Sequence, residues 1–400
     1  MIRHLFKLIW NRKKLNLLMI SGIFISFLAL FLVFSSIGYA AFNFLKPIGY
    51  AYEDVWYVSL DWKNQSAESI QKTLTQIENI LLAEEKIENI ALSRNYLFQP
   101  MVYSSANYYY NGKILKCFAG LAGEGFFDVL GVELIEGRWF NEGDRARQRT
   151  PIVINSDFKD KFSPGENAVG KILTNKNEDE EYEIIGVIGE FRRSGELAGS
   201  ESVVFKRLSF HNEKDLEVVA AEFWTRWLFK VKPGTSIRFE EQLMNTLQNA
   251  AKGWTIKIDT LEKARIRSLK TTLVFPIVIA IVCAFLIINV ALGLFGVIWY
   301  NINRRKSEIG LRRALGADTK LIYFQIIGET LMLATFGSVL GCLIALQFPI
   351  LDVIGFVDDK VYYFALGASL LGIYIISTIC ALYPGWLATK IQPAEALHNE

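Results

Sequence analysis

The chain has 400 residues, more than one domain of average length, and its 43 basic and 41 acidic side chains leave a net charge of +2. This balance lacks the basic excess of nucleic-acid-binding proteins, so we expect no nucleic-acid partner. Apolar residues make up 52% of the sequence and the mean hydropathy is +0.25, which indicates that part of the chain lies in a membrane.

Four long apolar runs predict transmembrane helices. Residues 15–45, 271–303 and 361–389 contain no charged side chain, and Glu329 is the single charge in residues 321–351. A helix needs about 20 apolar residues to cross a bilayer, and soluble helices seldom run this far without a charge. The first run exceeds the 7–15 apolar residues, roughly, of a signal peptide, so we expect it to be a retained helix.

Lysines and arginines in the short loops predict the orientation. The segment before the first run contains five of them, and the loop after the second run contains six between residues 304 and 320. The loop 352–360 contains three aspartates and one lysine. Because basic loops stay in the cytoplasm, the N-terminus, the second loop and the C-terminus are expected there.

The predicted fold is therefore four transmembrane α-helices with a large two-lobed α+β extracytoplasmic domain inserted between helices 1 and 2. We expect a lipid membrane around the helices and an outer domain that needs no disulfide, because Cys117 is its single cysteine. The predicted segments are a cytoplasmic N-terminus 1–16, helix 17–45, outer domain 46–270 with a β-rich middle lobe of about 120–215, helix 271–300, cytoplasmic loop 301–320, helix 321–348, outer loop 349–360, helix 361–387 and cytoplasmic tail 388–400.

Within the outer domain, strand–helix and helix–strand units flank a middle that is mostly β. The alternating, aromatic run 54–62 predicts a strand, and residues 66–87 predict a helix that Ser66 caps. Asn111-Gly112 predicts the turn of a hairpin over 107–121, while 235–251 and 253–261 predict a helix and a strand. Both ends of the domain must reach the membrane, so we expect the chain to return to its first lobe.

The charged segment 261–272 precedes the second apolar run and favours helix. It is either a stalk that continues the membrane helix outward or an ordinary flanking segment. The pattern alone does not separate these two interpretations.

The run from Gly165 to Lys171 has the spacing of a phosphate-binding loop, but Ile172 stands where that loop needs a Ser or Thr to reach Mg²⁺. A helix pattern precedes it and a strand follows it, which is the reverse of the required order. We therefore predict that its glycines shape a connecting loop, and that this chain binds no ATP.

Other chemistry is not indicated. The three histidines, at positions 4, 211 and 398, are far apart, and no G-x-S-x-G sequence occurs. Acidic residues between 124 and 133 fit a solvated surface better than an acid–base pair. We expect no catalytic residue, no cofactor and no metal, and hence no enzyme.

The loop after the second helix contains the most informative motif. In "KSEIGLRRALGA", residues 306–317, apolar side chains alternate with arginines in the manner of a short helix at the membrane surface, which Gly316 would end. By composition alone, a basic loop that only fixes topology is the simpler interpretation.

Residues 307–317, "SEIGLRRALGA", resemble the signature of the FtsX/MacB family of ABC-transporter permeases. The C-terminal "YPGWLATKIQPAEALHNE" is similar to that family's ending. In the outer segment, "LGVELIEGRWFNEGD" and the region from "PIVINSDF" to "VIGEF" are similar to the MacB-like periplasmic domain. The resemblance spans nearly the whole chain.

The resemblance implies a permease that dimerises, with itself or with a related permease, and docks two copies of a separate ABC ATPase. ATP is then bound by that partner, and its hydrolysis moves the outer domains (mechanotransmission), which drives efflux or release of envelope cargo. A periplasmic partner or outer-membrane component is a further candidate. Carried over residue by residue, the ATPase-coupling segment is Glu308, Ile309, Gly310, Leu311, Arg312, Arg313, Leu315 and Gly316.

Within the helices, Gly337 and Gly341 form a G-x-x-x-G pattern that favours close helix packing. Glu329 lies nine residues past Lys320, about 13 Å along a helix, where a carboxylate is costly. We expect a structural pairing rather than a proton relay, with Arg312, Arg313 or polar groups of a neighbouring helix as partners.

The expected location is a bacterial inner membrane, with the large domain in the periplasm. Two other roles remain open within the same family: regulation of a cell-wall hydrolase, as in FtsX-like members, and sensing of an envelope stress or an antimicrobial peptide. The sequence does not name the cargo.

Overall fold

The computed structural model describes residues 13–62, 65–95, 97–99, 104–175, 180–211, 213–220, 225–347 and 358–390. The chain divides into a helical unit, Met1–Phe42 with Leu273–Glu400, and a mixed unit, Asn43–Thr272. Most of the predicted N-terminus 1–16, outer loop 349–360 and tail 388–400 lies outside the described residues.

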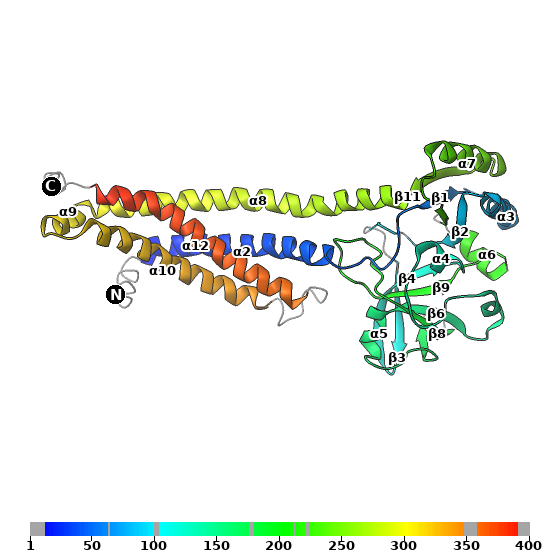
Figure 1. Cartoon of the computed structure of the whole chain (residues 1–400). Coiled ribbons are helices and arrows are strands. Elements are labelled where there is room, and N and C mark those ends of the chain that lie inside the picture. The colour runs from blue at the N-terminus through cyan, green and yellow to red at the C-terminus, as the bar shows by residue number, and fades with distance from the viewer. Residues whose placement is uncertain are drawn as a thin grey trace. The chain divides into compact units, whose positions relative to one another are not determined.

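The helical unit contains the predicted membrane spans. In the described part of the chain, four helices are long and apolar enough to cross a bilayer. They are α2 (Lys13–Phe44), α8 (Leu261–Arg304), α10 (Thr319–Ala345) and α12 (Asp359–Thr389). A short helix, α9 (Lys306–Ala314), lies between α8 and α10 at the end of the unit where α8 finishes (Figure 1). Apolar side chains from all five helices form the core of this unit.

The helix α8 begins well before the apolar run that predicted it. Residues 261–272 continue the helix without a break, so the stalk interpretation, and not an irregular flanking segment, describes this stretch. The Thr260 hydroxyl oxygen accepts a hydrogen bond from the Lys263 N–H at 3.1 Å and so caps the first turn. With 44 residues, α8 is about 66 Å long, twice the thickness of a hydrocarbon core of about 30 Å.

Two glycines let α10 approach α2 closely. A Cβ added to Gly337 would lie 2.6 Å from Ile23 Cγ2 and 3.1 Å from the Ile20 carbonyl oxygen. A Cβ added to Gly341 would lie 2.7 Å from Phe27 Cγ. Atoms at these distances overlap, so the G-x-x-x-G pattern serves helix packing within one chain.

The outer unit begins and ends in one antiparallel sheet. Its strand order is β11-β1-β10-β2, so the first strand of the domain lies between the last two. Three helices cover one face and share one apolar cluster with the sheet. These elements are β1 (Val55–Asp61), α3 (Ala67–Ala83), β2 (Ile87–Ser93), α6 (Glu213–Ala220), β10 (Arg226–Val231), α7 (Ile237–Ala250) and β11 (Thr255–Thr260). The predicted return of the chain to its first lobe is confirmed.

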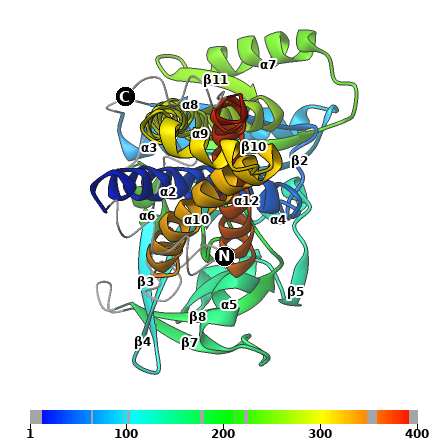
Figure 2. The same cartoon turned by 90° about the vertical axis from the view of Figure 1, so that its left-hand side faces the viewer.

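The second lobe is a closed ring of strands. The order β4-β3-β7-β8-β6-β9 returns to β4, which pairs in parallel with β9. These strands are β3 (Ser105–Tyr110), β4 (Lys113–Ala122), β6 (Thr150–Asn155), β7 (Ile172–Asn175), β8 (Glu180–Ile188) and β9 (Val203–Arg207), and β5 (Leu134–Gly137) pairs with β8. In both views the α5 end of this lobe lies opposite α7 and β11 within the outer unit (Figure 2).

Local signals explain several of these elements. Ser66 caps α3 by accepting a hydrogen bond from the Ser69 N–H at 3.4 Å. Asn111 and Gly112 both have positive φ, 46° and 79°, as a two-residue hairpin turn requires. Because the resulting hairpin β3–β4 pairs into the ring, the β-rich lobe starts near residue 105 and not near 120. The lobe also contains α5 (Ser156–Phe162), whereas α4 (Phe126–Leu130) packs against β2 and β10 of the first sheet.

Candidate functional site: the α9 segment and its contacts

The helix α9 is set between two sharp changes of direction. Arg305, with φ −101° and ψ 11°, is the single residue between α8 and α9. After Ala314 the chain turns at Gly316, whose φ of +89° suits glycine. The Asp318 carboxylate then caps α10 by accepting from the Lys320 N–H at 3.1 Å.

One face of α9 is fixed to the membrane unit. Ile309 and Gly310 are buried, and Ile309 belongs to the apolar core of the helices. The Arg313 guanidinium donates to the Thr389 carbonyl oxygen at the end of α12, at 2.9 Å. This last contact also satisfies a carbonyl group in the final turn of α12.

The other face of the segment is open. Leu311 is 50% exposed and Leu315 is 80% exposed. The sequence motif leaves open which apolar positions point inward, and the structure separates Ile309 from the two leucines. Exposed leucines beside arginines make a small amphipathic surface, suited to a protein partner or a membrane surface.

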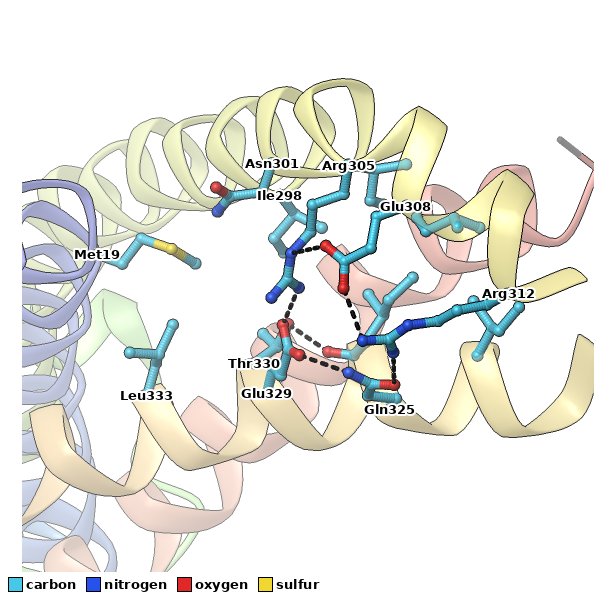
Figure 3. A pocket seen from close by; sticks show the side chains of 14 residues that line it. Met19, Ile298, Asn301, Arg305, Glu308, Arg312, Gln325, Glu329, Thr330 and Leu333 are labelled. Carbon is cyan, nitrogen blue, oxygen red and sulfur yellow. Dashed lines mark hydrogen bonds and ion pairs between the residues drawn. The ribbon is translucent and has the colours of Figure 1, made fainter. Parts of the chain in front are cut away.

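Five polar side chains form a closed circuit beneath α9 (Figure 3). Arg305 Nη1 donates to Glu329 Oε2 at 2.9 Å, and Gln325 Nε2 donates to Glu329 Oε1 at 3.0 Å. Arg312 donates to Gln325 Oε1 at 3.3 Å and to Glu308 Oε1 at 2.6 Å. The Glu308 carboxylate lies 3.7 Å from Arg305 Nε and completes the circuit. We call these five residues the polar circuit.

The predicted partners of Glu329 were wrong in part. Its ion pair is with Arg305, whereas Arg312 pairs with Glu308 and Arg313 donates to the Thr389 carbonyl oxygen. Arg312 reaches it only through the amide of Gln325. The reason is geometric: Arg305 lies at the junction of α8 and α9, facing the turn of α10 that contains Glu329 (Figure 3).

The polar circuit balances its own charge. Its two guanidinium groups face two carboxylates, so the charges of these four side chains cancel. Arg305 and Glu329 are the more enclosed pair, with side chains 13% and 22% exposed, against 45% and 46% for Arg312 and Glu308. Apolar side chains of α2, α8 and α10 line the rest of the same hollow, among them Met19, Ile298 and Leu333.

Two members of the circuit were missed by sequence reasoning. Arg305 stands among three consecutive basic residues, 304–306, which made it look like part of a topology signal. Gln325 is polar, lies one helical turn before Glu329 and was available as a partner by the i, i+4 rule. The Glu308–Arg312 pair follows the same spacing.

The phosphate-loop-like run lies in the outer unit, between α5 and β7. Lys171 donates to Glu166 at 2.6 Å and to the Ser163 hydroxyl, and Gly165 and Gly170 have φ values of 76° and 85°. The run is therefore a loop between a helix and a strand, whose lysine is bonded to its own loop. Among the described residues, no group of three His, Cys, Asp or Glu side chains is arranged to hold a metal ion.

An ion pair with a buried carboxylate also occurs in the outer unit. Arg138 donates to both carboxylate oxygens of Asp144, at 2.7 and 2.5 Å. Burial alone would raise the pKa of Asp144, but the bonds from Arg138 and the Asn141 N–H, with Arg147 nearby, hold that pKa below its usual range. The buried thiol of Cys117 has its pKa raised to about 12, chiefly by burial, which makes it unreactive.

Comparison with known families accounts for most of the chain. A model described as the MacB-like periplasmic core domain matches residues 17–246. A second, described as the FtsX-like permease C-terminal, matches residues 273–393. The first model alone covers more than half of the sequence.

Similar proteins carry one type of name. "Macrolide export ATP-binding/permease protein MacB 2" of Aeromonas hydrophila is 24% identical over 347 residues, which are 85% of this chain and 51% of that protein. "Macrolide export ATP-binding/permease protein MacB" of Hahella chejuensis is 22% identical over 353 residues, 85% of this chain and 50% of that protein. The chain spans about half the length of these curated relatives. The solved periplasmic region of MacB from Actinobacillus actinomycetemcomitans is 17% identical and covers 57% of this chain and 97% of its own, with a TM-score of 0.37.

Four apolar helices and an inserted α+β domain define a polytopic membrane protein with an extracytoplasmic domain, and the predicted fold class is confirmed. The chain belongs to the MacB/FtsX-like family of ABC transporter permeases.

Proposed function

We propose that this chain is the permease subunit of an ATP-driven complex in a bacterial inner membrane, in which a separate ATPase docks on α9. Two permease copies, or one copy and a related permease, would bind two ATPase subunits. Hydrolysis in the cytoplasm would then move the outer domains and so export or release a cargo on the far side. The names of the relatives, which specify macrolide export, favour efflux of an amphipathic small molecule.

The observation that carries this proposal is the division of α9 into two faces. Ile309 and Arg313 fix the helix to the membrane unit, while Leu311 and Leu315 stay exposed beside arginines. The basic residues 304–306, 312 and 313 favour the cytoplasmic side for this surface. One face of α9 is bound to the membrane unit and the other is exposed and apolar, which suits the docking of a cytoplasmic protein that exerts force on the helix.

Two observations support an ATPase on another polypeptide or domain. The matched regions, 17–246 and 273–393, are periplasmic and permease types and leave little of this sequence for a nucleotide-binding fold. The phosphate-loop-like Lys171 is bonded to Glu166 and Ser163 in the outer unit. We therefore expect the purified chain to hydrolyse no ATP by itself.

Co-purification tests the proposal. The tagged chain, extracted from its native membrane in mild detergent, should retain a subunit that hydrolyses ATP. Leu315→Asp should lower that retention about 30-fold, because a carboxylate in an apolar contact removes a typical hot-spot contribution of about 2 kcal/mol. Leu82→Asp, at an exposed leucine of α3 in the outer domain, is the matched control and should retain it fully.

A result in which Leu315→Asp retains the ATPase and transports normally would contradict the docking role. The segment 306–317 would then be a topology signal only.

A further inference from the structure

The polar circuit joins α9 to α10 at two separate points. We propose that it is a rigid linkage that transmits the position of α9 to α10, with Arg305 as the central positioning residue and Gln325 as the bridge. The proposal rests on the proposed function for the force that α9 receives. The linkage itself follows from the geometry of this chain.

Chain connectivity alone does not fix how α9 is rotated against α10. Arg305 is the single residue on one side, and the chain turns at Gly316, with φ of +89°, on the other. The N–H groups of Gly316 and Ala317 bond back to carbonyl oxygens of α9 and not to α10. The buried Ile309 holds position but not rotation, since apolar contacts are not directional, and the bond from Arg313 to the Thr389 carbonyl oxygen joins α9 to α12. Directional contacts between side chains must supply the rest.

The circuit supplies two such contacts at opposite ends of α9. Arg305, before its first turn, bonds to Glu329 at 2.9 Å, and Arg312, in its last turn, bonds to Gln325 at 3.3 Å. The two arginines are seven residues apart, about 10 Å along a helix, and their partners are one turn apart on α10. Two attachment points this far apart fix rotation as well as distance, whereas one would act as a swivel.

The internal bonds of the circuit make the two attachments act together. Gln325 donates to Glu329 at 3.0 Å and accepts from Arg312, so it ties the second attachment to the first. Glu308 lies between Arg312, at 2.6 Å, and Arg305, at 3.7 Å, and does the same on the α9 side. A displacement of α9 must therefore move α10 or break several charged contacts at once.

A simpler role for the ion pair is charge neutralisation, and the two roles separate when both charges are removed. Arg305→Met or Glu329→Leu alone leaves an uncompensated charge and disturbs folding. The double variant leaves none, and replacement of an enclosed pair by apolar side chains of similar volume is often neutral for stability. If the ion pair only neutralises charge, the double variant should regain both the stability and the transport that the single variants lose. If the ion pair is a linkage, the double variant should regain stability but not transport.

The first measurement is hydrogen–deuterium exchange of the purified full chain, which needs no partner. In the double variant we expect a wild-type thermal midpoint, with amides of residues 306–317 exchanging about tenfold faster as α9 loses one of its two attachments to α10. In the complex with the ATPase, co-purification should persist while ATP-dependent transport falls about tenfold, as expected for loss of a coupled contact. Unchanged exchange in residues 306–317, or normal transport, would overturn the linkage.

A second variant covers the case in which the double variant does not fold. Gln325→Leu keeps the three ion pairs of the circuit and breaks only the bridge, so exchange should rise about threefold over the same residues. The matched control is Tyr374→Phe, which removes the 2.9 Å bond between Tyr374 and Thr335 that links α10 to α12 outside the circuit. Equal exchange in both variants would overturn the proposal. If the wild-type protein co-purifies with no ATPase, the proposed function is rejected. The exchange result still decides the linkage in that case.

Discussion

The helix α10 is held in different ways at its two ends. Towards its C-terminal end, Gly337 and Gly341 lie against α2, where an added Cβ would overlap Ile23 or Phe27. Towards its N-terminal end, Gln325 and Glu329 reach α9 and Arg305 through long polar side chains. One contact is steric and leaves no free space; the other is made of directional hydrogen bonds and ion pairs.

The difference follows from the type of contact that each environment stabilises. Lipid offers no hydrophobic gain when two apolar helices meet, so close backbone approach over small residues has to stabilise the contact. Near the basic end of the unit, charged side chains hold α9 directionally and cancel each other's charge. The α2 contact is therefore a fixed anchor, and the polar circuit is where we propose that a movement of α9 reaches α10.

The largest expected effect concerns which end of α10 faces the cytoplasm. A cysteine at exposed Ser307 should resist an impermeant maleimide on intact spheroplasts and react after lysis, while one at exposed Gln148 should react in both. The parent chain is the control, since Cys117 is buried. Labelling of Ser307→Cys in intact spheroplasts would place this end of the helical unit outside the cytoplasm and contradict the predicted orientation.

The next effect comes from breaking the ion pair of the polar circuit. Glu329→Leu leaves Arg305 without its carboxylate, a loss of up to 3–5 kcal/mol for a buried pair, and about 2 kcal/mol here because both side chains are partly exposed. Glu329→Gln can still accept from Arg305 and should cost less than about 1 kcal/mol. Thermal unfolding in detergent measures both.

The same two variants also test a proton relay. Transport should survive in Glu329→Gln under the structural interpretation, because the side chain still bonds. Equal loss of transport in both variants, with both complexes intact, would show that ionisation itself matters.

A loss of comparable size is expected at the steric end. Gly341→Ala forces a methyl group against the Phe27 ring and should cost about 1–3 kcal/mol, the usual range for overpacking. Gly328→Ala is a control on the same helix, since an added Cβ there meets nothing within 4 Å. If the two alanines had equal thermal midpoints, α10 would not be anchored on α2 as described.

The smallest effect sharpens the comparison with an ion pair outside the membrane. The pKa of Asp144 is lowered in the folded protein. Its bond to Arg138 therefore stabilises the fold fully above the unfolded pKa of about 3.9, and this stabilisation is lost as the pH falls from there through the lower pKa of the folded state. Asp144→Asn should therefore cost about 1 kcal/mol at pH 7 and progressively less below pH 4. Exposed Glu142→Gln is the control; a cost for Asp144→Asn that stays constant with pH would contradict the ion pair.

Much of the fold could be predicted because single segments contain its signals. Apolar runs of 29 residues or more, with at most one charge each, specify the membrane helices, and Asn111-Gly112 specifies a hairpin. The closed ring of the second lobe could not be predicted, because it depends on a parallel pairing of β4 with β9, some 85 residues further along the chain.

The site was predictable in location but not in its contacts. The motif 307–317 identified α9, and the intramembrane charge identified Glu329. In the sequence, the basic residues 304–306 are equivalent as possible partners of Glu329. Only the direction of the turn between α8 and α9 selects Arg305. Which leucines face outward likewise depends on the bond from Arg313 to α12, which no local pattern specifies.

Site-specific photo-crosslinking at Leu315 tests the central claim most directly. A photoreactive residue there, in cells that contain the intact complex, should form an adduct with an ATP-hydrolysing subunit, because the side chain is exposed on the proposed docking face. The same residue at Ile281, exposed within the apolar run of α8, should form adducts with lipid or another helix and none with the ATPase. Lipid adducts at both positions would contradict the account, since α9 would then rest on the membrane and not on a cytoplasmic partner.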